Sequence, residues 1–277
     1  MSESFSLNLI IFILAPFIGA LIMGVERILR ARMQNRVGPP LLQPFYDLFK
    51  LASKRSMIVH SYHAVLGIAY FFVEWIALGM LLFGEDLIMV IFFKLLASSM
   101  LFYGAYSSRS VFSQMGANRE LIAILAYEPI LVFSSIGLFF VTGSFLTSGI
   151  AQYDGIALFW LPLIFIAFFI ASLIKLGKSP FDIAEAHQEI AGGAEIEYSG
   201  IFYEAVYGAK WLNYVFIYGF LYLFSSGSFL FFIVLSLLFF VASNLIDNST
   251  ARVNYKQMLW IVGILGFGLS IINLLVL

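Results

Sequence analysis

The segment Lys175–Gly200, KLGKSPFDIAEAHQEIAGGAEIEYSG, separates two very apolar stretches of the chain. Ser179 suits a helix N-cap, Pro180 suits the first helical position, and Gly192-Gly193 would end the helix, so the sequence predicts a short helix between them. Carboxylates spaced three and four residues apart would then share one face and repel one another, which indicates a function rather than local stability. The alternative is a solvated acidic loop helix. The segment holds five of the sixteen acids of the chain: Asp182, Glu185, Glu189, Glu195 and Glu197.

The composition is that of an integral membrane protein. Of 277 residues, 62% are hydrophobic and 11% are charged, whereas roughly 25% are charged in an ordinary soluble domain. A net charge of −1 gives no reason to expect nucleic acid as a partner. The absence of cysteine excludes disulfides, thiolate-bound iron–sulfur clusters and cysteine zinc sites in this chain, and three histidines are too few for a metal cluster. We expect no metal, no cleavable signal peptide and a single membrane domain over residues 1–277.

Long apolar runs predict an all-α protein with about eight transmembrane helices. Each crossing needs about 20 mostly apolar residues, and a barrel would instead show short alternating segments. The odd connections carry bases, seven of them within residues 26–60, and the even connections carry acids and no base. By the positive-inside rule the two large loops, residues 29–60 and 177–200, face the cytoplasm, and both termini face outside the cell membrane. The predicted spans are about 7–28, 61–83, 87–107, 119–141, 156–176, 201–224, 226–246 and 257–276.

The first large loop is predicted to contain a turn and a short helix. Gly38-Pro39-Pro40 forces the turn, and Pro44 suits the start of a helix that would run to about Ser53. Asp47 and Lys50 lie three residues apart on that helix and could pair. The alternative is a loop whose bases only follow the topology rule and contact anionic lipid.

Several charged residues fall inside predicted spans. A charge at the bilayer centre costs on the order of 3 kcal/mol or more, so such groups usually face a bundle interior or water. Lys94 could pair with Glu74, whereas Glu204 and Lys210 could instead reach back to the interface. Glu128 precedes a proline, which locally breaks the helix, and we interpret it as a protonatable group. Because the sequence has no phosphate-binding loop, dinucleotide fingerprint, catalytic triad or zinc-protease motif, we expect no catalytic residue in this chain.

Four motifs in order resemble those of the complex I heel family, the membrane proteins on which the soluble arm of complex I sits. They are ARMQNRVGPPLLQP (31–44) with DLFKL (47–51), GANREL with YEPI (116–130), GKSPFDIAEAHQEI ending in EYSG (177–200), and DNSTAR (247–252). The compact first loop is similar to that of energy-converting membrane-bound hydrogenases and formate hydrogenlyase, and the related sulfane-sulfur reductases share this architecture. One departure is His187, which stands where many relatives carry an acid.

The resemblance implies a non-catalytic membrane subunit that anchors a soluble redox arm and couples ferredoxin-linked electron transfer to proton or sodium translocation. Its partners would be a large hydrogenase-like subunit, a small iron–sulfur subunit, and antiporter-like and small membrane subunits in the lipid bilayer. Nickel–iron and iron–sulfur centres would lie in these partners, with no cofactor in this chain. The alternatives are the quinone-site subunit of a complex I-like dehydrogenase, the equivalent subunit of a sulfane-sulfur reductase, a purely structural anchor and a free-standing transporter. The quinone alternative predicts a quinone-sized cavity between the first and sixth spans.

Two sets of candidate site residues follow from this resemblance. Redox-arm docking is expected at Arg32, Gln34, Arg36, Gln43, Asp47, Lys50 and Arg119. The ion path and its coupling to the arm are expected at Asp182, Glu185, Glu189, Glu195, Glu197, Glu128, Glu74, Lys94, Glu204 and Lys210.

Overall fold

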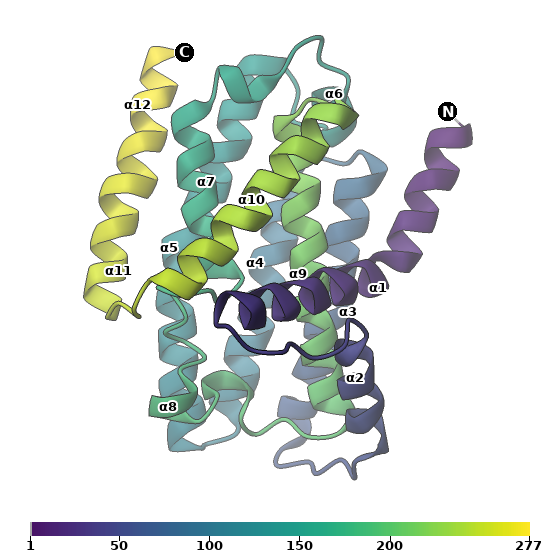
Figure 1. Ribbon diagram of the computed structural model, residues 1–277, viewed down its shortest axis with the longest axis vertical. Helices are drawn as coiled ribbons and strands as arrows, with labels where there is room; N and C mark the ends of the chain where they lie inside the picture. The colour runs from purple at the N-terminus through teal and green to yellow at the C-terminus, as the bar shows by residue number, and fades with distance from the viewer. Residues whose placement is uncertain (1) are drawn as a thin grey trace.

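The computed structural model describes residues 2–277, and these residues form a bundle of helices (Figure 1). The long apolar runs become helices because lipid offers backbone N–H and C=O groups no partner outside the helix itself. The elements are α1 (Ser2–Met33), α2 (Gln43–Ser53), α3 (Ser61–Phe83), α4 (Leu87–Ser107), α5 (Val111–Thr142), α6 (Thr147–Ala151), η1 (Ala157–Phe159), α7 (Pro162–Lys175), α8 (His187–Ile190), η2 (Gly193–Glu195), α9 (Ile201–Phe224), α10 (Phe229–Ser249), α11 (Tyr255–Ile261), η3 (Val262–Gly268) and α12 (Leu269–Val276).

Within residues 2–277, six helices are long and apolar enough to cross a membrane, namely α1, α3, α4, α5, α10 and the continuous α11–η3–α12. They coincide with six of the predicted spans, so the prediction of an all-helical integral membrane protein is confirmed. The fifth and sixth predicted spans also form helices, but α7 has 14 residues and α9 carries two charged residues. The total of eight crossings therefore stays a prediction.

Two predicted span boundaries are wrong. The first helix continues to Met33, five residues beyond its predicted end, because ILRARM contains strong helix formers and no breaker. The bases Arg27, Arg30 and Arg32 consequently belong to α1 and not to a loop. The helix α5 begins at Val111 and not near residue 119, so Arg119 also lies on a helix.

The helix α9 occupies the centre of the bundle and packs against α1, α3, α7 and α10. Phe216, Phe220 and Phe224 are buried on it, and Phe168 of α7 stacks on Phe220 with ring centroids 4.9 Å apart. Since other helices cover α9 on several sides, it can direct a charged side chain into the bundle without exposing that charge to lipid.

The helix α1 is bent, and its second half crosses the bundle over α9 (Figure 1). Pro16 lies inside this helix, and an internal proline removes a backbone hydrogen bond and kinks the chain. The crossing half brings Glu26, Arg27 and Arg30 to the region where α9 meets the loop before it.

Both ends of the chain lie at one end of the bundle, and α2 and α8 lie at the other (Figure 1). The helix α2 confirms the short helix predicted to begin near Pro44. Its apolar side chains Phe45, Leu48 and Leu51 pack with Tyr207 and Trp211 of α9. This burial fixes the first large loop against the bundle.

The helix predicted between Pro180 and Gly192 is wrong. The chain turns repeatedly through residues 177–186, and α8 contains only four residues. Asp182 and Glu185 therefore share no helical face. The reason is tertiary: their basic partners lie on different elements, and a regular helix would point the carboxylates along a single face away from one of them. The side chain of His187 lies outside the part of the chain that the structure describes.

Candidate functional site

Carboxylates of the second large loop are paired with bases from other elements. Asp182 accepts two hydrogen bonds from Arg252, with N–O distances of 2.8 and 2.6 Å. Glu189 accepts one from Arg119 of α5 at 2.7 Å, and Arg252 lies 3.5 Å from it. Hydrogen bonding from Arg119 holds the pKa of the exposed Glu189 carboxyl below its usual range. These pairs tie the loop to α5 and to the segment before α11, and they remove the repulsion that a shared face would have caused.

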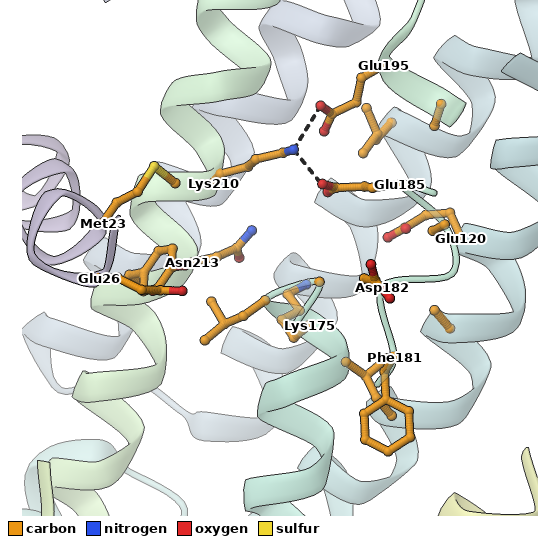
Figure 2. A pocket seen from close by; sticks show the side chains of 18 of the residues that line it. Met23, Glu26, Glu120, Lys175, Phe181, Asp182, Glu185, Glu195, Lys210 and Asn213 are labelled. Carbon is orange, nitrogen blue, oxygen red and sulfur yellow. Dashed lines mark ion pairs between the residues drawn. The ribbon is translucent and has the colours of Figure 1, made fainter. Parts of the chain in front are cut away.

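Lys210 of α9 joins two further loop carboxylates. Its ammonium lies 2.8 Å from Glu195 and 3.0 Å from Glu185 (Figure 2). Lys210 therefore turns into the molecule and does not reach back to the interface. Burial raises the pKa of Glu195 to about 7, although Lys210 favours its charged form. Glu120 of α5 lies beside Glu185 (Figure 2). This group of acids around one base can take up or release a proton near neutral pH.

These side chains face a cavity of about 320 Å³ enclosed by the loop and by α1, α5 and α9. The cavity lies between α1 and α9, which is where the quinone alternative predicted one. Its lining is dominated by charges, however, and such a lining favours water and ions over an apolar ring. The charged residues that line it are Glu26, Arg27, Arg30, Glu120, Lys175, Asp182, Glu185, Glu195 and Lys210.

A buried ion pair lies next to this cavity. Lys94 of α4 donates to Glu74 of α3, and both side chains are fully buried, so the pairing that the sequence suggested is present. Lys94 also donates to the Asn213 Oδ1 at 2.5 Å, and the Asn213 amide donates to the Tyr70 hydroxyl at 3.3 Å. Because Asn213 and Tyr70 line the cavity, one amide connects the ion pair to it.

Lys175, at the end of α7, links the cavity to two buried acids. Its ammonium donates to Ser98 at 2.9 Å and to the Tyr127 hydroxyl at 3.0 Å. It lies 3.9 Å from an oxygen of Glu74 and 3.9 Å from an oxygen of Glu128. Within the described residues neither oxygen of Glu128 has a hydrogen-bond partner. A buried carboxylate in this condition needs a water molecule or a proton.

Part of the predicted docking set is occupied by contacts inside the protein. Asp47 accepts hydrogen bonds from Arg27 at 2.7 Å and from Gln43 at 2.9 Å. Partial burial pushes the pKa of Asp47 upward, but these hydrogen bonds outweigh it and bring the pKa below its usual value. The pair that the sequence suggested between Asp47 and Lys50 is wrong, because Asp47 faces α1 while Lys50 is exposed.

The rest of the docking set lies at the end of α1 and on α5. Arg32, Gln34 and Arg36 are exposed, and Gln34 donates to Asn248 of α10 at 3.1 Å. Their exposure leaves them available to a partner. Arg119 instead holds the second loop, since it donates to the Ile183 carbonyl at 3.2 Å as well as to Glu189.

Two predicted members of the ion path stay apart from the others. Glu197 and Glu204 are half-buried, and neither makes an ion pair inside the described part of the chain. Across residues 2–277, no three His, Cys, Asp or Glu side chains are grouped so that they could hold a metal ion.

The structure adds a second buried ion pair that sequence reasoning missed. Glu26 of α1 lies 3.2 Å from Lys178, both side chains are buried, and Arg30 connects Glu26 to Asp247 of α10. Burial lowers the pKa of Lys178, against the attraction of Glu26. Glu26 was hidden in the sequence because it precedes a run of arginines that was interpreted as a loop. An acid within such a run was the available signal.

Comparison with known proteins places these features in one family. The family model described as NADH dehydrogenase matches residues 6–277. The chain belongs to the NADH dehydrogenase family. Over 235 residues it is 31% identical to a subunit of the NADH-quinone oxidoreductase of Aquifex aeolicus (strain VF5), which covers 73% of this chain and 70% of that protein. Over 218 residues it is 30% identical to Hydrogenase-4 component C of Escherichia coli (strain K12), covering 69% of this chain and 67% of that protein.

A solved structure shares the whole fold of this NADH dehydrogenase family member. A chain of the membrane-bound sulfane sulfur reductase, an archaeal respiratory membrane complex, superposes with a TM-score of 0.87 at 25% identity, covering 98% of both chains. The family resemblance drawn from the four motifs is confirmed. Relatives in the family are thus named as components of a quinone oxidoreductase, a hydrogenase and a sulfane sulfur reductase, and their similar identities do not separate these types.

Proposed function

We propose that this chain anchors the soluble redox arm of a ferredoxin-linked, hydrogenase-type membrane complex and couples electron transfer there to proton or sodium translocation. One observation carries the proposal: the charged cavity connects the loop carboxylates to the buried Glu74–Lys94 pair through Asn213 and Lys175. In this proposal the chain is one membrane domain that crosses the cell membrane eight times. Both termini lie outside, and the end that bears α2 and α8 faces the cytoplasm.

The coupling would be electrostatic. A redox change in the arm alters the charge or position of Glu185 and Glu195, which share Lys210. Charges in a poorly polarisable interior influence one another strongly, so their protonation states are coupled. Lys175 would respond because it lines the same cavity, and it lies 3.9 Å from both Glu74 and Glu128. Antiporter-like and small membrane subunits would then move the ions.

The chemistry would take place in partner subunits. A large hydrogenase-like subunit and a small iron–sulfur subunit would hold the nickel–iron and iron–sulfur centres, and this chain would supply no catalytic group. The end with α2 and α8 would be their docking floor, with the exposed Arg32, Arg36 and Lys50 available for contact.

The deciding experiment is a gentle detergent purification of the chain from its native membrane, with partners identified by mass spectrometry and nickel assayed. We expect nickel together with a large subunit that has two CxxC pairs. A related large subunit without nickel would overturn the hydrogenase assignment and favour a sulfur reductase or a quinone-linked complex. Recovery of the chain without any redox subunit would overturn the anchoring role.

The position of the cavity favours one second candidate, the quinone-site subunit of a complex I-like dehydrogenase. The cavity lies between α1 and α9 beneath the second loop, and its volume of about 320 Å³ falls at the lower end of small-molecule sites. A photoreactive quinone analogue added to the purified complex tests this candidate. Labelling of peptides from Met23–Arg30 and Lys210–Tyr214, with competition by excess quinone, would favour it over the hydrogenase assignment.

A further inference from the structure

A second cavity, of about 300 Å³, lies between the end of α2 and residues 191–203. We call it the α2 groove. Leu51, Lys54 and Arg55 line one side, and Ile196, Tyr198 and Tyr203 line the other. Both sides belong to the end of the bundle that bears α2 and α8 (Figure 1). The proposed function leaves this groove without a role.

The groove carries positive charge that the protein itself does not neutralise. Lys54 and Arg55 are exposed, and neither makes an ion pair with any described residue. Glu195 also lines the groove, but its carboxylate is already held by Lys210 at 2.8 Å. Two unpaired bases beside a satisfied acid favour an anionic occupant.

The wall of the groove is fixed in place by a tyrosine. The Tyr198 ring stacks on His63 with centroids 3.7 Å apart, and it fills the space left by two glycines. A Cβ added to Gly67 would lie 2.4 Å from this ring, and one added to Gly104 would lie 2.3 Å from its hydroxyl. The loop before Tyr198 is equally close to α5, because a Cβ on Gly116 would lie 2.4 Å from the backbone of residues 193–194.

Hydrogen bonds join the two sides of the groove to each other. The Ser199 hydroxyl accepts from the Met57 N–H at 2.8 Å and donates to the Met57 carbonyl at 3.0 Å. The Ser56 hydroxyl accepts from the Ile201 N–H at 3.2 Å. A groove that is already formed costs a partner little ordering free energy on binding.

Apolar side chains beside the groove are left uncovered. Phe49 is 67% exposed, Met57 is 72% exposed and Ile58 is 60% exposed, and they flank Lys54 and Arg55 in sequence. Apolar surface beside unpaired bases is typical of a protein interface. The groove is also built from two connecting segments at the end of the molecule, and not from the side of a span that faces lipid.

From these features we infer that the α2 groove binds a carboxylate-bearing segment of the soluble redox arm, with Lys54 and Arg55 contacting its acidic groups. The inference rests on the proposed function, since it names the chemistry of the docked partner. It also gives docking an electrostatic consequence. Glu195 lines both the groove and the charged cavity, so a negative charge bound in the groove favours the protonated form of Glu195.

Site-specific photocrosslinking in the intact complex tests the inference. A photoreactive residue at Lys54 is expected to capture an acidic peptide of a soluble subunit, and one at the exposed Arg36 serves as the docking control. Capture of the arm from Arg36 while Lys54 reacts only with lipid, or with nothing, would overturn the groove assignment and leave docking intact. Failure at both positions would count against the anchoring role as well.

Charge reversal supplies a second measurement. Lys54→Glu with Arg55→Glu should weaken retention of the soluble arm by roughly tenfold, because close interfacial charge pairs contribute strongly to binding. The control is Lys256→Glu, which changes another exposed base without an ion pair in the described chain. Since all three residues are exposed, folding should be unaffected. Equal retention in both variants would overturn the inference.

Discussion

Lys175 shows how a single charge can belong to two environments at once. It lines the charged cavity, and its ammonium is also 3.9 Å from Glu74 and from Glu128. Its hydrogen bonds to Ser98 and Tyr127 keep it in this position. A change of charge on the cavity side is therefore felt by acids deep in the bundle, because little water separates them.

Glu128→Gln tests the deep end of this path. Glutamine keeps the shape of the side chain but cannot carry the negative charge or exchange the proton of a carboxyl group. We expect normal assembly, intact electron transfer to a soluble acceptor and a several-fold loss of ion pumping in membrane vesicles. Glu204→Gln is the control, since Glu204 makes no ion pair within residues 2–277. Unchanged pumping in Glu128→Gln would remove this residue from the path.

Glu195 predicts a pH dependence of stability. Its pKa of about 7 lies above the ordinary value of 4.5 because the folded protein buries it. Below about pH 4.5 the carboxyl is protonated whether the chain is folded or unfolded, and its contribution to stability is fully present. As the pH rises through about 7, the folded protein must ionise a buried group, so that contribution is lost.

Glu195→Gln should consequently flatten the decline in melting temperature of the purified complex between about pH 5 and pH 8. Glu197→Gln, two residues away and half-buried, should leave the slope as it is in the natural protein. Infrared spectroscopy gives an independent check, since a protonated carboxyl band that titrates near pH 7 should disappear only with Glu195→Gln. A melting curve with the same slope in all three proteins would contradict the assignment.

At the scale of elements, small residues decide how closely the second loop approaches the helices. Gly104→Ala would place a Cβ 2.3 Å from the Tyr198 hydroxyl, so the tyrosine must leave its slot between α3 and α4. We expect faster amide hydrogen exchange in residues 193–200, measured by mass spectrometry. Gly263→Ala is the matched control, because nothing lies within 4 Å of a Cβ added there. Equal exchange in the two variants would show that Tyr198 does not hold this loop.

The helices could be predicted because long apolar runs in lipid have one way to satisfy their backbone groups. The helix α2 could also be predicted, since Pro44 marks its start and its apolar side chains recur at helical spacing. The second loop could not. Its caps indicated a helix, but pairing of Asp182 with Arg252 and of Glu185 with Lys210 depends on residues far away in sequence.

The site was predictable to a similar degree. Charges inside apolar runs stand out, so Glu74, Lys94 and Glu128 could be found from depth alone. The pairs around the cavity depend on how α1 crosses the bundle, and a kink at Pro16 gives a helix no defined direction in the sequence. Glu26 therefore remained hidden until its contact with Lys178 was visible.

At the scale of the whole molecule, the arrangement gives the charged cavity and the α2 groove to the same end of the bundle, opposite the termini (Figure 1). The bases also concentrate at this end: Arg32, Arg36, Lys50, Lys54 and Arg55 are all exposed there. Since basic connections are retained in the cytoplasm, the soluble arm and both cavities would lie on the cytoplasmic side.

The absence of cysteine allows a clean test of this orientation. Ser53→Cys places a thiol at the exposed end of α2, and Asp154→Cys places one in an exposed connection near the opposite end. In intact cells a membrane-impermeant maleimide should label Asp154→Cys, whereas Ser53→Cys should react only after the membrane is opened. Natural protein without cysteine gives the background. The reverse pattern would put the α2 groove outside the cell, where no ferredoxin-linked arm could reach it, and both the anchoring role and the groove assignment would fail together.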